Sequence, residues 1–136
     1  MTMLDKWTDK CLLNIDKIDQ QHKAFFNLWN TEMEQVDTQD RIQMTQVIEK
    51  LEDYIKAHFR EEEELMVKSG YNDIEKHIDQ HKYLIQKVDD LKQELDYNNP
   101  LIHEKTAVFM KKWFLNHIIQ SDKEYQQSVL EYLNKK

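Results

Sequence analysis

Glycine and proline are almost absent from this sequence, which contains one of each in 136 residues. Because these residues end helices and form the tight turns of hairpins, their scarcity argues against a β-rich fold and for a few long helices. Cysteine is also scarce: Cys11 is alone, which excludes an intrachain disulfide and fits a reducing compartment. We interpret Cys11 as a small buried thiol rather than a catalytic nucleophile.

Basic charge is in deficit as well. The chain has 26 acidic and 19 basic residues, a formal net charge of -7. Sequence-independent nucleic-acid binding needs a basic surface, so no nucleic-acid partner is expected. The sequence has no apolar run long enough to cross a bilayer, and its first residues, "MTMLDKWTDK", lack the apolar core of a signal peptide. These absences predict no membrane insertion and a cytoplasmic location.

Apolar residues recur at helical spacing in four segments. The expected helices run from about Asp19 to Gln35, Gln39 to Lys68, Asp73 to Leu95 and Pro100 to Leu133. Thr38 is the expected N-cap of the second helix, and Gly70 suits the left-handed position at its C-terminal end. Short connections favour an all-α, up-down-up-down antiparallel four-helix bundle. We expect one domain over residues 1–136, with an arm at 1–18 and the bundle at 19–133.

The second expected helix contains the run "HFREEEELM", residues 58–66. The apolar stripe of this helix passes through Ile48, Leu51, Ile55, Phe59 and Met66. Glu62 falls on that stripe, one turn after His58. A buried carboxylate or imidazole is costly unless it is paired or bound to a metal, so this pair is a candidate for a metal site. The other glutamates of the run are expected in solvent: Glu61, Glu63 and Glu64.

The other three expected helices carry further donors at inward positions. His77 and His81 lie one turn apart on the third helix, a spacing that is weak evidence alone because chance produces it readily. His22 begins the apolar face of the first helix. His117 and Asp122 lie in "WFLNHIIQSDKEY" on the last helix. Facing helices of a bundle assemble metal sites in its core, so these residues predict one.

The number of donors favours two metal ions over one. A single ion takes four to six ligands, fewer than the five imidazoles and two carboxylates of this set. Two octahedral ions offer twelve coordination positions. Five imidazoles, two bridging carboxylates and one bridging oxygen fill eleven of them. One position stays open for a small molecule.

These segments resemble the bacterial hemerythrin family. The matching motifs are Asp19–Gln21–His22, "HFREE" from His58 with Met66 after it, the His77/His81 pair and "WFLNHIIQSDKEY", and the resemblance spans residues 7 to 125. It implies a non-haem diiron centre with a bridging oxo or hydroxo group. The implied function is reversible O2 binding for oxygen carriage, storage or delivery, with an oxygen-accepting enzyme left open as a partner.

The resemblance also implies residue roles. His77, His81 and His117 would hold one iron, and His22 and His58 the other, which keeps the open position. Glu62 and Asp122 would bridge the two ions. The implied O2 pocket is apolar and consists of Phe25, Phe59, Trp113, Phe114 and Ile118. His103 matches no ligand position and is expected at the surface.

Most aromatic residues at helical spacing only pack in a core. We assign that role to Phe26, Trp29 and Phe109, and we favour packing over chemistry for Trp7 and Tyr125.

Three features depart from the family pattern or from a regular helix. Asn14 stands where the family commonly has glycine, and asparagine tolerates a positive φ. Phe25 and Phe114 stand where leucine is common, so bulkier walls are expected to slow ligand entry or to tune affinity. Asp122 follows His117 by five residues, which on a regular α-helix separates the two side chains by about 140°. The spacing therefore predicts a π-type irregularity near residues 117–122.

Four other functions remain open. A diiron oxidase, peroxidase or nitric-oxide-handling enzyme is disfavoured by the histidine-rich donors and the lack of an acid at the open position. Iron storage with ferroxidase activity normally uses more carboxylates. A sensor of O2, redox state or iron is often fused to an output domain, for which this chain has no room. A structural zinc site rarely needs seven ligands.

Overall fold

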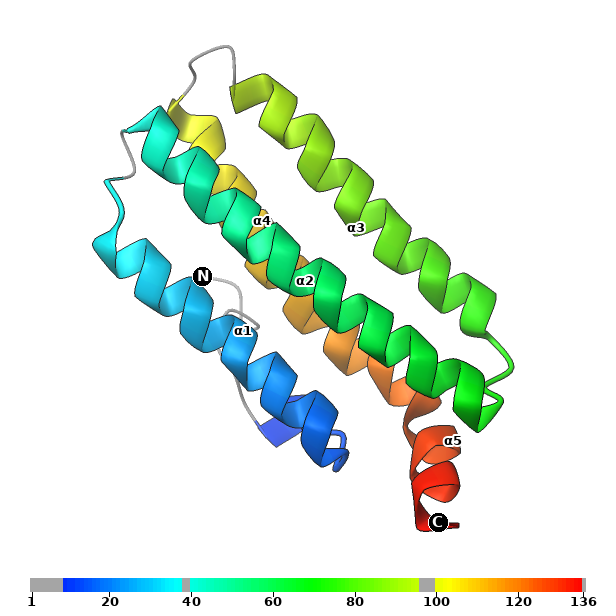
Figure 1. The fold of residues 1–136 in the computed structure, drawn as a ribbon. Coiled ribbons are helices and arrows are strands. Elements are labelled where there is room, and N and C mark those ends of the chain that lie inside the picture. The colour runs from blue at the N-terminus through cyan, green and yellow to red at the C-terminus, as the bar shows by residue number, and fades with distance from the viewer. Residues whose placement is uncertain (1–8, 38–39, 96–99, 136) are drawn as a thin grey trace.

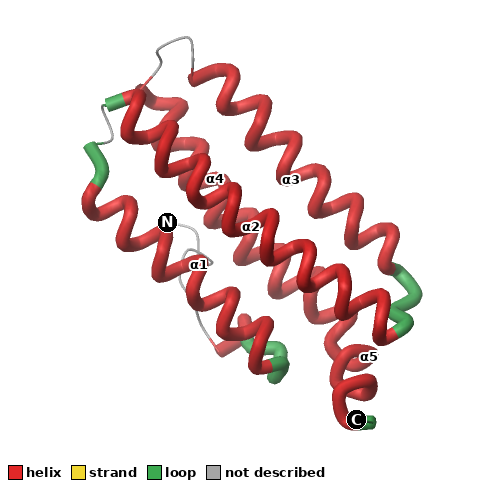
Figure 2. The backbone as a smooth tube through the Cα atoms, in the orientation of Figure 1, coloured by secondary structure: helices red, strands yellow, loops and turns green. Residues whose placement is uncertain are grey.

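The computed structural model describes residues 9–37, 40–95 and 100–135 of the chain. Its elements, in chain order, are a short 3-10 helix η1 (Asp9–Cys11), α1 (Asp16–Gln35), α2 (Arg41–Ser69), α3 (Ile74–Leu95), α4 (Pro100–His117), a π-helical turn η2 (Ile118–Asp122) and α5 (Lys123–Asn134). The last three form one continuous rod, so four rods lie side by side (Figure 1). Successive rods run in opposite directions (Figure 2), which confirms the predicted antiparallel four-helix bundle.

The helix ends follow from local chemistry, with two differences from expectation. α1 begins at Asp16, so the last residues of the expected arm are already helical. The N-cap of α2 is Asp40, whose side chain accepts hydrogen bonds from the backbone N–H groups of Ile42 and Gln43 at 2.9 and 3.1 Å. Thr38, the expected cap, lies outside the described residues. Gly70 ends α2 with φ 71°, as predicted.

The segment before α1 is tied to the bundle at several points. Asn14 has φ 60°, the left-handed conformation that asparagine tolerates. The turn lets the backbone N–H of Leu13 donate to Asp19 at 2.9 Å, while its carbonyl accepts from the Gln126 side chain at 2.7 Å. Cys11 is fully buried in the core, as expected. Trp7 lies outside the described residues.

Two apolar clusters fill the interior on either side of a polar layer. One contains Phe25, Phe59, Phe114 and Ile118, and the other contains Leu13, Ile18, Met66 and Tyr125. Each such side chain contributes roughly 1.5–3 kcal/mol by leaving water. On α1, His22 lies between Ile18 of one cluster and Phe25 of the other. The polar layer is therefore held between two dry regions. Phe26 is buried, and Trp29 and Phe109 pack against the first cluster, as expected.

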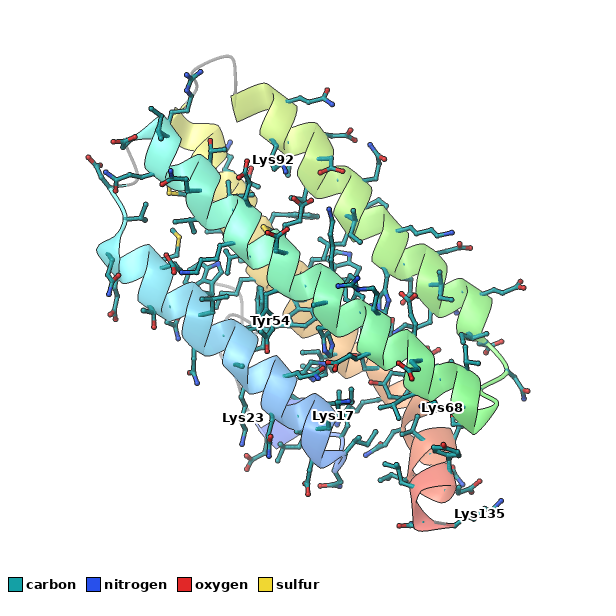
Figure 3. The ribbon with its side chains drawn as sticks, viewed as in Figure 1. Lys17, Lys23, Tyr54, Lys68, Lys92 and Lys135 are labelled. Carbon is teal, nitrogen blue, oxygen red and sulfur yellow. The ribbon has the colours of Figure 1, made fainter. Side chains whose placement is uncertain are left out.

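The outer faces of the rods carry the charged residues. Lys17 and Lys68 extend outward from α1 and α2 with most of their side chains exposed (Figure 3). Glu52 is an exception, because it is buried between helices and is paired with Lys92 of α3 at 2.8 Å. None of the described helices combines the length and the apolar character needed to span a membrane.

Candidate metal centre

The seven predicted donors meet in the polar layer of the bundle. α1 supplies His22, α2 supplies His58 and Glu62, α3 supplies His77 and His81, and the fourth rod supplies His117 and Asp122. All are buried, the most exposed being His117 at 5%. Their donor atoms form two groups that share Glu62. The structure thus brings together every residue that the sequence suggested as a ligand.

The first group contains three imidazoles. Nε2 of His117 lies 3.1 Å from Nε2 of His77 and 3.1 Å from Nε2 of His81. Oε1 of Glu62 lies 2.9 Å from Nε2 of His81, and Oδ1 of Asp122 lies 3.0 Å from Nε2 of His77. Neighbouring ligands on an octahedral ion with bonds of about 2.1 Å are about 3 Å apart. These five atoms therefore have the spacing of ligands around one ion.

The second group contains two imidazoles. Nε2 of His22 lies 3.1 Å from Nε2 of His58. The other oxygen of Glu62 lies 3.3 Å from Nε2 of His58, and the other oxygen of Asp122 lies 3.3 Å from Nε2 of His22. Each carboxylate thus turns one oxygen toward each group. This is the arrangement of two carboxylates that bridge a pair of ions.

The two oxygens of Asp122 test whether the donors fit cations. Both are buried and have no partner aligned for a hydrogen bond, although nitrogens of His22, His77 and His117 lie within 3.0 to 3.3 Å. A buried carboxylate normally has hydrogen bonds, because leaving it without them is costly. The donor atoms of each group also lie within 4.8 Å of one another, as the ligands of one ion would. The residues therefore fit a cation in each group.

A π-helical turn brings the last two donors to the same side of their rod. The turn covers Ile118–Asp122, directly after His117, as the five-residue spacing predicted. In a regular α-helix Asp122 would point about 140° away from His117. The wider turn lets both side chains enter the core, and the irregularity coincides with the site, as such turns often do.

The imidazoles and carboxylates of the cluster stabilise one another's charged forms. Burial lowers the pKa of His22 and of His77, but the carboxylates of Asp122 and Glu62 outweigh it and raise both values to about 9. Burial raises the pKa of Glu62, but the imidazole charge of His58 and hydrogen bonds from neighbouring histidines hold it well below the usual value. Without a cation, the site therefore favours imidazolium beside carboxylate.

Two histidines have their second ring nitrogen fixed by a neighbour. Nδ1 of His58 lies 2.6 Å from Oε1 of Gln21, and Nδ1 of His81 lies 2.7 Å from Oε2 of Glu63. An acceptor at Nδ1 holds the proton there and leaves Nε2 free for a metal. The Gln21 side chain in turn donates to Glu61.

The expectation of solvated glutamates is therefore wrong for two residues of the acidic run. Glu61 and Glu63 are partly buried and make contacts behind the donors, since their neighbours on α1 and α3 come within reach. Glu64 is exposed, as expected, and pairs with Lys68 at 2.9 Å. Tyr125 also does more than pack, because its hydroxyl donates to Oε2 of Glu62 at 2.8 Å. His103 has its side chain outside the described part of the structure.

The apolar residues divide between the two groups. Phe114 meets His22 and His58 edge to face, with ring centroids 5.4 and 5.6 Å away, and Phe25 packs on Phe114 at 4.6 Å. On the other side, two aromatic rings stack on histidines of the three-histidine group. Phe59 stacks on His81 at 3.6 Å, and Trp113 stacks on His117 at 4.5 Å. Ile118 is fully buried in the same cluster.

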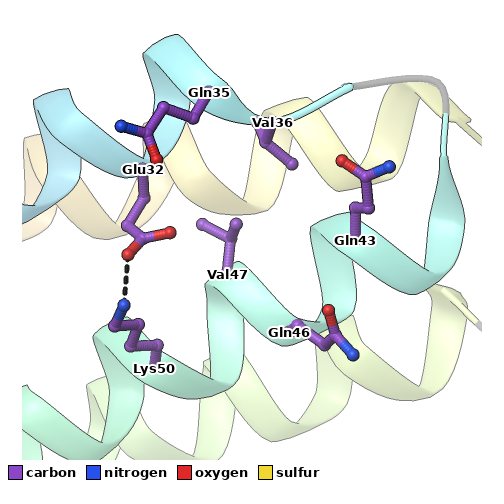
Figure 4. A pocket seen from close by; sticks show the side chains of 7 residues that line it. All are labelled: Glu32, Gln35, Val36, Gln43, Gln46, Val47 and Lys50. Atoms are coloured by element: carbon purple, nitrogen blue, oxygen red, sulfur yellow. Dashed lines mark hydrogen bonds and ion pairs between the residues drawn. The ribbon is translucent and has the colours of Figure 1, made fainter.

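Two pockets open on the surface of the described part of the bundle. One reaches the polar layer and the other does not. A groove of about 500 Å³ between α2 and α3 is lined by Phe59, Glu63 and His81 among other residues, so its floor reaches the three-histidine group. A second pocket, of about 310 Å³, lies between α1 and α2 (Figure 4). It is lined by glutamines and valines with the Glu32–Lys50 ion pair, and none of the seven donors reaches it.

Comparison with known proteins agrees with this geometry. Residues 13–128 match a family model described as the hemerythrin HHE cation binding domain. The chain is 32% identical to a bacteriohemerythrin of Clostridium acetobutylicum, over 88% of this chain and 96% of that protein. It is 31% identical to a bacteriohemerythrin of Methylococcus capsulatus, over 82% and 86%. It is 26% identical to a myohemerythrin of Theromyzon tessulatum, over 89% and 90%.

Solved structures give the same result. Crystal structures of two hemerythrin variants, with tyrosine and with alanine in place of one leucine, each match with a TM-score of 0.79 and 29% identity, over 95% of this chain and 98% of theirs. The fold and the donor cluster thus define a helical-bundle protein with a cation site in its core. The chain belongs to the hemerythrin family.

Proposed function

We propose that this protein binds O2 reversibly at a pair of iron ions and serves in oxygen carriage, storage or delivery. His77, His81 and His117 would hold one ion, His22 and His58 would hold the other, and Glu62 and Asp122 would bridge them. We also propose that the chain forms a single domain of this kind. The supporting observation is that both carboxylates turn one oxygen toward each histidine group.

The donor set gives each ion a different number of protein ligands. Three imidazoles and two carboxylate oxygens surround the first position, and two imidazoles and two carboxylate oxygens surround the second. An ion at the second position would therefore have fewer protein ligands, which would leave room for a small molecule. A pair of ferrous ions held by these residues would supply the two-electron chemistry that reversible O2 binding needs.

The protein's contribution is positioning and exclusion of water. Imidazoles are neutral ligands, so five of them add no negative charge to the pair, and charge near a metal is a main control on its redox behaviour. Phe114 covers the two-histidine group with apolar surface, and Phe25 packs behind it on the Phe114 ring. Phenylalanine donates no proton, so this wall does not assist cleavage of the O–O bond. We therefore propose binding rather than turnover as the main activity.

The experiment is an anaerobic titration of the diferrous protein with O2, followed by removal of O2. We expect two irons per chain and a visible absorption band that appears with O2 and disappears without it. A single irreversible oxidation would instead favour an oxidase or peroxidase. The same titration with nitric oxide tests the other alternative, because a band that appears with nitric oxide but not with O2 would favour nitric-oxide handling.

A further inference from the structure

The two histidine groups are supported by chemically different neighbours. Behind His81, on the three-histidine side, Nδ1 faces the carboxylate of Glu63 at 2.7 Å. Behind His58, on the two-histidine side, Nδ1 faces the amide oxygen of Gln21 at 2.6 Å. The distances are nearly equal, so the difference lies in charge. One imidazole donates its proton to an anion and the other to a neutral group.

The orientation of the Gln21 amide is determined by its surroundings. If Nε2 of His58 binds a metal, Nδ1 carries the proton and needs an acceptor, which only the amide oxygen provides. The amide nitrogen then donates to Glu61. The Tyr54 hydroxyl donates to the Gln21 backbone carbonyl at 2.9 Å, and Figure 3 shows Tyr54 between α1 and α2. Glu61 itself lies 3.5 Å from Lys17. The two-histidine side therefore also has a carboxylate, that of Glu61, but the Gln21 amide lies between it and the His58 imidazole.

A carboxylate that accepts the imidazole proton draws it partly away and makes the ring a stronger, more anionic donor to its metal. A stronger donor favours the ferric over the ferrous state. An amide oxygen fixes the ring without that effect. His81 and His58 are therefore expected to differ in donor strength, although both are imidazoles.

We propose that Gln21 and Glu63 are positioning residues that make the two iron positions redox-inequivalent. Glu63 strengthens His81 as a donor to the three-histidine iron. Gln21 keeps His58 weaker and favours the ferrous state at the ion that receives O2. This inference rests on the proposed function, but it concerns the ligands' donor strength rather than O2 binding itself.

The main variant exchanges the two groups behind His58. Gln21→Glu combined with Glu61→Gln moves the carboxylate next to the imidazole and keeps the composition and the net charge. The reverse change, Glu63→Gln, removes the carboxylate from His81. Glu64→Gln is the matched control, because it removes the same charge from an exposed neighbour.

The first measurement is the reduction potential of the diiron protein. Changing such a neighbour typically alters metal affinity or activity 10- to 100-fold, and a tenfold change in the ferric/ferrous ratio is about 59 mV for one electron. We expect at least tenfold stabilisation of ferric iron in the double variant and at least tenfold stabilisation of ferrous iron in Glu63→Gln. Glu64→Gln should match the parent protein. Shifts in the same direction, or none, would overturn the proposal, since a purely structural role predicts no opposite signs.

A second measurement separates this inference from the proposed function. In protein loaded with Zn(II), ¹⁵N NMR reports how anionic each imidazole is. We expect the Nδ1 signals of His58 and His81 to differ, and Glu63→Gln to remove the difference. Equal signals in the parent protein would overturn the inference even if O2 binds reversibly. Distinct signals would support it even if the iron protein does not bind O2.

Discussion

The hydroxyl of Tyr125 donates a hydrogen bond to one particular oxygen of Glu62. That oxygen, Oε2, faces His58 at 3.3 Å, whereas Oε1 faces His81 at 2.9 Å. Burial and the nearby carboxylates raise the pKa of Tyr125 well above its usual value, so the phenol stays a neutral donor. The contact connects α5 to α2 in the layer between the two apolar clusters. It holds Glu62 in the orientation that presents one oxygen to each histidine group.

We expect Tyr125→Phe to destabilise the metal-free protein. A hydrogen bond to a charged group contributes about 1.5–3 kcal/mol, so the free energy of unfolding should fall by about that amount. Denaturant unfolding in the presence of a chelator measures it. Tyr71→Phe is the control, because Tyr71 donates to Glu124 at an exposed contact of 3.3 Å, and its loss should stay within about 0.5 kcal/mol. Equal losses of unfolding free energy in the two variants would show that the hydrogen bond to Glu62 stabilises the fold no more than an exposed one.

Glu62→Gln tests the bridging role. An amide has only one carbonyl oxygen and no charge, so it cannot offer an anionic oxygen to both groups. We expect fewer than two irons per chain by metal analysis, with the helical circular dichroism preserved. Glu64→Gln removes the same charge from an exposed position of α2 and should keep two irons. Full iron content in Glu62→Gln would refute the bridge.

The fold was predictable because local signals agree along the chain. The chain has few glycines and prolines, four apolar stripes and short connections between them. Together these features favour a helical bundle over other folds. Even the π-turn followed from one number, the five-residue spacing of His117 and Asp122. The end of α2 at Gly70 was readable for the same reason, since the cap residue carries its own backbone preference. The start was not, because Asp40 and Thr38 are both good caps.

The sequence predicted those site residues that lie on the apolar stripe of a helix, because their position implies burial. Glu62 stands out because a charge on an apolar stripe needs a partner. Glu61 and Glu63 do not stand out, because they flank the stripe and their partners come from other helices. Gln21 of α1 and His81 of α3 reach them only after the rods are packed at a particular rotation. No spacing within one segment contains that information. The hydroxyl of Tyr125 was missed for the same reason.

Phe114 is expected to control access to the two-histidine group. Its ring meets both His22 and His58 edge to face, so a smaller side chain opens space beside them. We expect Phe114→Leu to speed the exchange of a small ligand such as azide, measured by stopped flow. Phe109→Leu is the control, because Phe109 packs at the margin of the same cluster and should leave exchange unchanged. Equal exchange rates in Phe114→Leu and the parent protein would show that the ring does not limit entry.

The raised pKa values predict how metal binding depends on pH. His22 and His77 have a pKa of about 9 without a metal, so near pH 7 both hold a proton that a cation must displace. The apparent affinity for Zn(II), measured by competition with a chelator, should therefore rise with pH up to about 9, with a slope of log affinity approaching two.

Stability of the metal-free protein should change in the opposite direction. A folded pKa raised above the unfolded value of 6.5 contributes stability that is complete below pH 6.5 and is lost as the pH rises through 9. The free energy of unfolding with a chelator present should therefore decrease across this window, while that of the metal-loaded protein should not. The two measurements together identify the cause, since a general loss of folding at alkaline pH would lower both stabilities. An affinity for Zn(II) that does not change between pH 7 and 9 would mean that the carboxylates do not hold protons on these imidazoles.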